Sequence, residues 1–237
     1  MGTVYLLTLR QLAGTWRLVI MAVLAALPAL LTMVMLSNDR APSVQEFETA
    51  VLGAMLAGSI GPLVVLAIAA AAFANELEDR TLANLTLAPI PRWQLVLPKL
   101  LAAITLAAPF MLLSALATSW IAYLGDPPAI VADMVGTLAA VALYASGFVW
   151  LGLVTTQAIG IGLLYIVLWE GFISGFVTGA RLLSIRHTAI ALMHAVDPRL
   201  FAFDGHPGDV VAVIATLLVL GTFFWLAVRR MRRMDVP

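Results

Sequence analysis

Long apolar stretches separated by short charged ones dominate this chain. A helix needs about 20 residues to cross the hydrocarbon core of a membrane. Residues 16–36, 50–74 and 100–124 each form such a stretch, and each contains one proline. Prolines are tolerated inside spanning helices because neighbouring groups satisfy the freed carbonyl. The pattern predicts three spanning helices in the first half of the chain.

The second half contains a run of 36 uncharged residues. As one straight helix it would be about 54 Å long at about 1.5 Å per residue, which is too long for one crossing. Glycine and polar residues gather near Gln157, so we expect a tight turn there between spans at 134–156 and 158–178. A last span follows at 210–228. The whole chain, 1–237, is thus predicted to be one all-α integral membrane domain with six transmembrane helices.

Basic residues predict which ends of the spans face the cytoplasm. Six spans place both termini on one side, together with the connection at 75–99 and the turn near Gln157. That side holds nine of the thirteen lysines and arginines, with a dense cluster at 229–233. We therefore expect cytoplasmic termini and a cytoplasmic 75–99 connection.

Two other segments leave the simple pattern. Residues 3–14 form either an interfacial helix or an extension of the first span. The outer connection between the last two spans, about 178–209, is the longest, and its apolar middle suits partly helical, surface-lying or re-entrant structure. Its three histidines, His187, His194 and His206, have no carboxylate cluster beside them, so we interpret them as surface or packing residues.

Composition supports a membrane protein and excludes several kinds of chemistry. Hydrophobic residues make up 62% of the chain and charged residues 11%, with a mean hydropathy of +1.03. Soluble chains are about half apolar and about a quarter charged. The chain has no cysteine, no G-x-x-x-x-G-K-[ST] loop and no H-E-x-x-H pair. We expect no catalytic residue, no metal, no cofactor of its own and no nucleic-acid partner.

The 75–99 connection is charged although both of its neighbours are apolar. Asn75 can cap a helix over about 75–88, whose first turn contains three carboxylates that favour the positive helix end. Two prolines after this helix end it. Arg92 and Trp93 then suit the headgroup zone, and Lys99 is expected where the chain re-enters the membrane.

This segment resembles the hallmark of ABC transporter permeases of the ABC-2 exporter type. The family pattern is approximately E-x-E-x-G-T-L, a proline-bearing step, an aromatic or basic residue, and a lysine at the next span. The matching residues are Glu76, Glu78, Thr81, Leu82, Pro89, Arg92, Trp93 and Lys99. Arg80 and Pro98 stand where the family often has glycine. The six-span layout fits the same family along the whole chain.

The resemblance implies that 75–88 is a coupling helix that docks on a separate ATPase subunit, where ATP and Mg²⁺ would bind. The docking residues would be Glu76, Glu78, Asp79, Arg80, Thr81, Leu82 and Leu85. It further implies a dimer with a second permease copy or a paralogue, in the inner (plasma) membrane of a bacterium. The cargo would be a hydrophobic small molecule, a lipid or a peptide, with ions and copper-site or haem-related cargo left open.

Two other functions fit the same sequence. The chain could be a non-transporting membrane partner of an ATPase, serving mechanical signalling or assembly. It could instead be a secondary carrier that uses Glu170, which lies about 18 Å past the turn near Gln157 at about 1.5 Å per residue. An ionisable group at that depth indicates function. Alternatively, Glu170 pairs with Arg181 or Arg186 and holds the outer loop.

Several apolar and small residues of the second and fifth spans each have two possible roles. Phe172 and Phe176 could line a translocation path or an outer gate beside Glu170, or they could pack in the core. Small residues spaced by four allow close helix contact. Such residues are Gly53, Gly61, Gly171 and Gly175. They could face a partner protomer or pack within one protomer.

Overall fold

The computed structural model describes residues 2–37, 42–73, 91–202 and 206–233, and every regular element in these ranges is a helix. Six helices are long and apolar enough to cross a membrane. They are Thr15–Leu36, Val44–Phe73, Trp93–Ala122, Pro127–Val154, Ala158–Phe176 and Asp209–Arg233. The all-α, six-helix prediction is confirmed. The predicted coupling helix at 75–88 lies outside the described residues.

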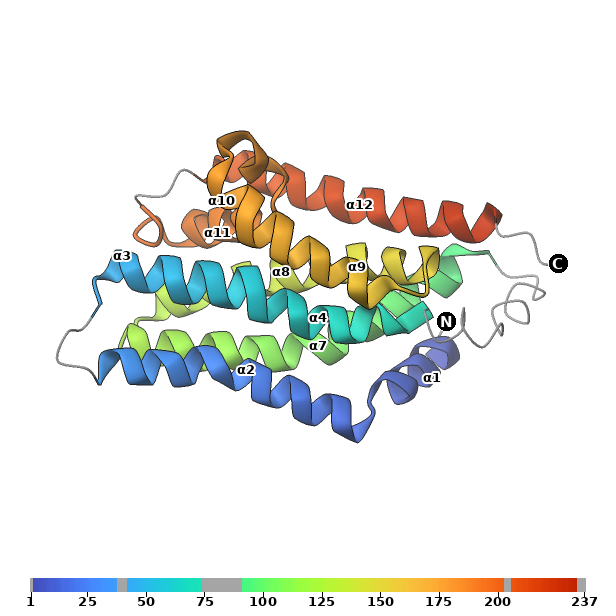
Figure 1. Cartoon of the computed structure of the whole chain (residues 1–237), viewed down its shortest axis with the longest axis horizontal. Helices are drawn as coiled ribbons and strands as arrows, with labels where there is room; N and C mark the ends of the chain where they lie inside the picture. Colours follow the sequence, from blue (N-terminus) through green and yellow to red (C-terminus); the bar gives the residue numbers. More distant parts are fainter. Residues whose placement is uncertain (1, 38–41, 74–90, 203–205, 234–237) are drawn as a thin grey trace.

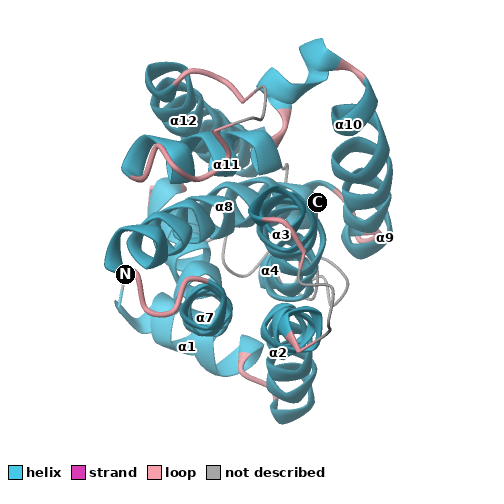
Figure 2. Ribbon diagram, turned by 90° about the vertical axis from the view of Figure 1, so that its left-hand side faces the viewer, coloured by secondary structure: helices cyan, strands magenta, loops and turns pink. Residues whose placement is uncertain are grey.

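The helices run roughly side by side along one direction (Figure 1). α8 (Pro127–Val154) is central and packs against α4 (Gly61–Ala69), α7 (Trp93–Ala122), α11 (Ile185–Val196) and α12 (Asp209–Arg233). Figure 2, which looks along the bundle, shows these elements around α8. The beginning of α1 and the end of α12 lie at the same end of the bundle, here called the terminal end.

Three spans begin earlier than the hydrophobic pattern indicates. The structure starts them at Val44, Trp93 and Pro127 rather than at 50, 100 and 134. Each added stretch contains a charged residue that interrupts the hydrophobic pattern: Glu48 in the second span, Lys99 in the third and Asp133 in the fourth. Ser43 with Glu46 also forms a capping box before the second span. Hydropathy marks the apolar part of a helix, whereas capping groups decide where the backbone bonds begin. The sequence-based boundaries were therefore wrong by about two turns.

The N-terminal segment is a separate helix and not an extension of the first span. α1 (Gly2–Leu12) ends before Gly14, which has an extended backbone, and α2 (Thr15–Leu36) starts in a new direction (Figure 1). α1 packs against α7. Of the two possibilities left by the sequence, the structure selects the independent helix.

The second span changes its winding along its length. α3 (Val44–Phe47) leads into η1, a π-helix at Glu48–Ile60, and then into α4. The wider turn shows in a hydrogen bond that Ser59 Oγ donates to the Ala54 carbonyl, at 2.8 Å. A Cβ on Gly61 would lie within 3.0 Å of the Leu56 carbonyl oxygen, so this junction needs glycine. π-Helical turns are uncommon and often occur at functional sites.

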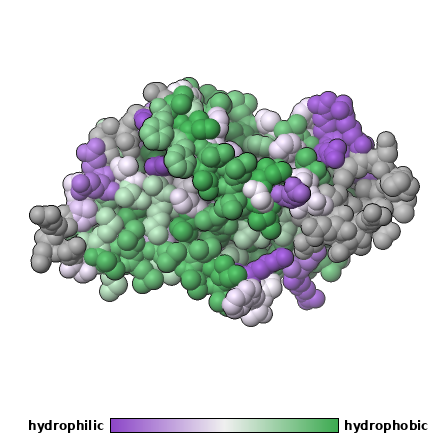
Figure 3. Space-filling model, viewed as in Figure 1, coloured by the Kyte–Doolittle hydropathy of each residue, from purple (hydrophilic) through white to green (hydrophobic). Residues whose placement is uncertain are grey.

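The fifth span and the outer connection are also composite. The fifth span consists of α9 (Ala158–Leu164), η2, a π-helix at Tyr165–Ile173, and α10 (Ser174–Phe176). The outer connection contains η3, a 3₁₀ helix at Thr178–Leu183, and α11. The connection between the fifth and sixth spans therefore contains helical segments. Apolar residues cover the middle of the visible surface and hydrophilic ones gather towards its two ends (Figure 3).

Candidate functional site

The residues predicted to dock an ATPase lie outside the described part of the chain. They are Glu76, Glu78, Asp79, Arg80, Thr81, Leu82 and Leu85. The helices on either side of this segment are described, and both reach the terminal end of the bundle (Figure 1). The site can therefore be built from its two flanks.

Lys99 ties these two flanks together. Its side chain is only 1% exposed, and Nζ donates a hydrogen bond to the Ala72 carbonyl oxygen at 2.6 Å. The ammonium also lies 4.3 Å from the centroid of the Phe73 ring, in cation–π geometry. The sequence placed Lys99 just before a span that starts at residue 100. In the structure it lies about two turns inside α7, because helix and apolar stretch do not start together.

The other flanking residues, Arg92 and Trp93, stand at the beginning of α7. Arg92 is the N-cap residue, and Trp93 is 40% exposed. An exposed indole beside a basic residue at a helix end suits the interfacial zone of a bilayer. The headgroup role predicted for this pair stays a prediction.

Glu170 is fully buried and joins the fifth span to the outer connection. Its carboxylate accepts hydrogen bonds from Tyr165 Oη at 2.7 Å, Ser184 Oγ at 2.6 Å and the Ile185 backbone N–H at 3.0 Å. Ser184 is also the N-cap residue of α11. The three donors hold the start of α11 against η2. Whether Glu170 serves transport or pairs with Arg181 or Arg186 to hold the outer loop stays a prediction.

Phe172 and Phe176 lie on the outside of the single chain. Their exposed fractions are 58% and 84%, so neither packs in the core of the protomer. Gly171 and Gly175 are exposed on the same span, and a Cβ on Gly175 would meet no atom within 4 Å. Together these four residues form an exposed face of the fifth span, here called the span-five face.

Gly53 and Gly61 occupy a different environment. Both are buried, and a Cβ on Gly53 would contact Arg186 and Ile190 of α11 at 3.4 Å. α11 lies over this part of the second span within the same chain. Gly61 lies beside Leu56 of its own turn and Met111 of α7. The dimer contact predicted for these two glycines stays a prediction.

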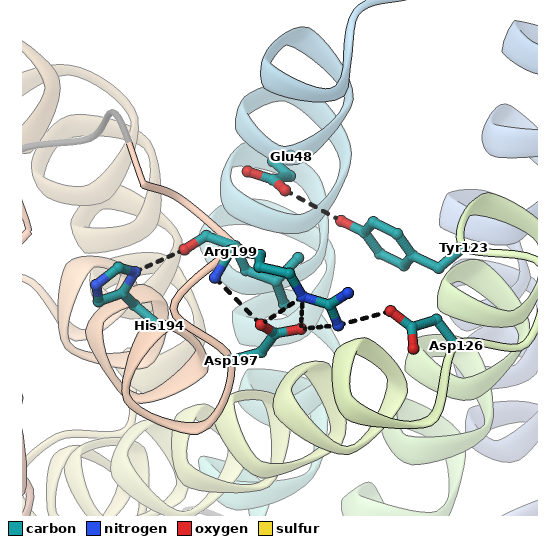
Figure 4. A network of polar contacts seen from close by, with 7 residues as sticks. Glu48, Tyr123, Asp126, His194, Asp197 and Arg199 are labelled. Carbon is teal, nitrogen blue, oxygen red and sulfur yellow. Dashed lines mark hydrogen bonds and ion pairs between the residues drawn. The ribbon is translucent and has the colours of Figure 1, made fainter.

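A polar network that the sequence did not reveal closes the end of the bundle opposite the termini (Figure 4). Glu48 is 1% exposed and accepts hydrogen bonds from the Phe201 backbone N–H at 2.8 Å and from Tyr123 Oη at 3.4 Å. Phe201 is buried with a φ of 54°, a left-handed conformation that a bulky residue adopts only under tertiary constraint. Burial, and next the charge of Glu48, raise the pKa of Tyr123.

An ion pair lies beside this network. The Arg199 guanidinium contacts Asp126 at 2.6 Å and Asp197 at 2.7 Å, so it links the end of α11 to the turn between α7 and α8 (Figure 4). Hydrogen bonds from Arg199 hold the pKa of Asp197 below its ordinary value. His194 contacts the Leu200 carbonyl oxygen through Nδ1 at 2.8 Å. Arg199 and Asp126 are 73 residues apart along the chain, so no local pattern indicates their contact.

Asp133, which directly precedes the span predicted at 134–156, is also buried. It lies inside α8 and accepts hydrogen bonds from Ser119 of α7 and from Thr137, one turn further along α8. The difference arises because α8 begins at Pro127, two turns before the expected start. Among the described residues, no group of three or more histidine or acidic side chains is placed to hold a metal ion.

Comparison with known proteins identifies the family. Residues 6–183 match the family described as ABC-2 family transporter protein. No curated protein matches the chain. The matched range covers more than half of the chain and includes the first five spans. The chain therefore belongs to the ABC-2 family and is a membrane transport permease.

Proposed function

We propose that the chain is the transmembrane subunit of an ATP-binding-cassette exporter, driven by a separate ATPase subunit that binds the 75–88 segment. Membership of the ABC-2 family is the observation that carries this proposal. The chain has no phosphate-binding glycine loop of its own. ATP and Mg²⁺ would bind in the ATPase subunit, and this chain would perform no covalent chemistry.

The charge distribution supports a cytoplasmic position for the docking segment. α12 ends at the terminal end with Arg229, Arg230, Arg232 and Arg233. Basic residues next to a span favour the cytoplasmic side. The ends of α4 and α7 that flank the 75–88 segment lie at this same end. We infer a multi-pass protein of the bacterial inner membrane with cytoplasmic termini.

In this mechanism, closure of the ATPase subunits on ATP pushes the 75–88 segment. Lys99 links the two spans that carry the segment, so displacement of one span moves the other. The result is a shift in population between arrangements of the bundle that are open to opposite sides. The cargo would be a hydrophobic small molecule, a lipid or a peptide, because the spans offer mainly apolar surface.

Two permease chains would together form the path, in contact through the span-five face. Phe172 and Phe176 supply exposed aromatic area there, and Gly171 and Gly175 allow close approach of a second helix. The secondary-carrier alternative has less support. Three hydrogen-bond donors already hold the Glu170 carboxylate between two elements, so it serves as an anchor in this arrangement.

Co-purification tests the docking proposal. The double variant Glu76→Ala/Glu78→Ala should lose a co-expressed ATPase subunit, because both carboxylates that begin the docking helix are removed. The control is Asp209→Ala, which removes an exposed acid at the opposite end of the bundle. The readout is the ratio of ATPase to permease after affinity purification in mild detergent.

Normal assembly and normal ATP turnover in the double variant would refute the docking assignment. Transport by the reconstituted complex separates the remaining functions. Export that stops when the ATPase is inactivated supports the exporter. Export that persists and follows the proton gradient indicates the carrier, and ATP turnover without any export indicates the non-transporting partner.

A further inference from the structure

A half-open cavity of about 450 Å³ lies beside α8. η2 and α12 flank it, and both α9 and α12 pack against α8. Its lining reaches from Ile161 to Trp169 in the fifth span and from Val219 to Phe223 in α12. Both stretches lie in the middle of spanning helices, so the cavity opens at the level of the hydrocarbon core.

Half of the twelve lining residues are aromatic, and they come from three spans. They are Tyr144, Phe148, Trp150, Tyr165, Trp169 and Phe223. Several already pair with one another. The rings of Phe148 and Tyr165 meet edge to face at 6.4 Å, and those of Trp150 and Phe223 lie 5.6 Å apart. An inserted aromatic ring would find the same edge and face contacts.

The two tyrosine hydroxyls are engaged elsewhere. Tyr144 donates to the Ala57 carbonyl oxygen at 3.1 Å, and Tyr165 donates to Glu170 at 2.7 Å. The cavity therefore offers ring surface while these hydroxyls face other partners. A ligand bound there needs few polar groups. The cavity volume of about 450 Å³ lies within the range of about 300–1,000 Å³ found for small-molecule sites.

We propose that this aromatic cavity binds a hydrophobic small molecule with aromatic rings, taken up sideways from the bilayer. That the bound molecule is cargo rests on the proposed exporter function. Ring-rich lining favours such a ligand over a lipid acyl chain, which gains area burial but no ring pairing. The site lies within a single chain, between the fourth, fifth and sixth spans, with Leu183 and Ile185 of the connection between the last two spans also in its lining. A second copy is not needed to complete it.

Gly147 provides a direct way to fill the cavity. It lines the cavity, and a Cβ there would meet only Phe223, at an ordinary contact distance of 3.8 Å. A leucine at this position can therefore occupy cavity volume without forcing the backbone apart. Gly221 on α12 is the matched control, because it is exposed and a Cβ there would meet nothing within 4 Å.

The test uses the full-length permease in lipid nanodiscs, with 1-methylpyrene as an uncharged aromatic probe. Trp150 and Trp169 line the cavity and would transfer excitation energy to bound pyrene. We expect saturable energy transfer. Gly147→Leu should weaken the affinity for the probe about tenfold, because it removes cavity volume and ring contacts. Gly221→Leu should leave the affinity unchanged. Phe223→Leu, which removes one ring but keeps an apolar side chain, should weaken it too.

Equal, saturable binding by both glycine variants, or only non-saturable transfer that follows the lipid content, would overturn the proposal. Displacement of the probe by oleyl alcohol but not by unlabelled phenanthrene would assign the cavity to acyl chains instead. Binding is measured without the ATPase subunit, so its failure is distinct from failure of the docking experiment. A gel-filtration profile and a helical circular-dichroism spectrum like those of the wild type show that Gly147→Leu folds.

Discussion

At the scale of single residues, the buried charged groups of this chain hold distant segments together. Lys99 joins the second span to the third, Glu170 joins the fifth span to α11, and Glu48 joins the second span to the chain at Phe201. Each is at most 1% exposed. Burial of a charge is costly unless hydrogen bonds or an opposite charge compensate it. Removal of one partner should therefore cost more than a surface substitution.

Lys99→Met removes the buried ammonium and leaves an apolar side chain of similar length. The variant should lower the apparent Tm in detergent, because the Ala72 carbonyl loses a charged donor that is worth about 1.5–3 kcal/mol. If Lys99 also transmits motion, ATPase activity in the complex should no longer respond to cargo although the ATPase still binds. Leu101→Met, on the exposed side of the same helix, is the control. Normal coupling in Lys99→Met would exclude the linking role.

The environment of His187 should make the stability of the fold depend on pH. Burial, with the nearby charges of Arg186 and Arg181, lowers its pKa from 6.5 to about 4. The folded chain thus keeps this imidazole neutral, while the unfolded chain takes up a proton below pH 6.5. This residue's contribution to stability is full above pH 6.5 and falls as the pH drops towards 4.

Thermal melts between pH 7.5 and pH 4.5 in steps of about half a unit test this dependence. His187→Gln should flatten the fall in apparent Tm, whereas His206→Gln should leave it unchanged. An identical pH profile for wild type and His187→Gln would show that other groups carry the acid sensitivity.

At the scale of elements, glycines decide how closely α8 approaches its neighbours. A Cβ on Gly152 would lie within 3.0 Å of the Ala70 carbonyl oxygen, and one on Gly136 would lie within 3.0 Å of Met193. Ala70 presents backbone, which cannot rotate away. Gly136 meets the flexible Met193 side chain first and the Ala189 carbonyl oxygen, at 2.9 Å, only after it. The packing of α8 against the second span therefore depends most on Gly152.

Gly152→Ala should destabilise the fold although alanine favours helices by about 1 kcal/mol over glycine. The added methyl must push α8 away from the second span, and overpacking of this kind costs about 1–3 kcal/mol. Gly160→Ala in α9 meets nothing within 4 Å and should be neutral or slightly stabilising. Apparent Tm values of the two variants, measured together, check the opposite signs. A stabilised Gly152→Ala would show that α8 packs less closely than described.

At the scale of the whole molecule, the span-five face is the surface we assign to a second permease. Its four residues are exposed although they are apolar or small. The second, third and fourth spans bury more of their surface than the fifth, whereas the first and last spans are also largely exposed. A cavity inside one chain and a contact face on its fifth span can coexist, because the cavity lies nearer the terminal end than Phe176 does. The dimer would then present two such cavities.

Cysteine cross-linking tests this contact without background, since the chain contains no cysteine. Gly175→Cys should form a disulfide-linked dimer in membranes treated with copper phenanthroline, because symmetric helices cross closely at small residues. Gly221→Cys, on the exposed side of α12, should stay monomeric on non-reducing gels. Cross-linking through Gly221→Cys alone would move the dimer contact to α12.

Much of the fold could be predicted from the sequence because membrane-spanning helices are recognisable by their apolar composition. All six were found, including the division near Gln157, since twenty apolar residues in a row have few alternatives to a membrane helix. The boundaries at Val44, Trp93 and Pro127 were misplaced because a buried charged residue inside each helix, Glu48, Lys99 or Asp133, interrupts the hydrophobic pattern. The roles of Gly53 and Gly61 stayed undecided because spacing alone cannot tell which neighbour a small residue faces.

By itself, the sequence determined the class of the protein: a six-span, all-helical permease whose motif at 75–99 carries the family resemblance. Composition, charge bias and residue spacing are properties of short stretches of sequence, so they can be recognised without knowledge of the tertiary structure. Only the tertiary structure decided that Glu48, Lys99 and Glu170 are buried anchors, and that aromatic rings from three spans surround one cavity. These features depend on contacts between residues far apart in the sequence. Such contacts form only when the helices pack, so no local sequence pattern predicts them.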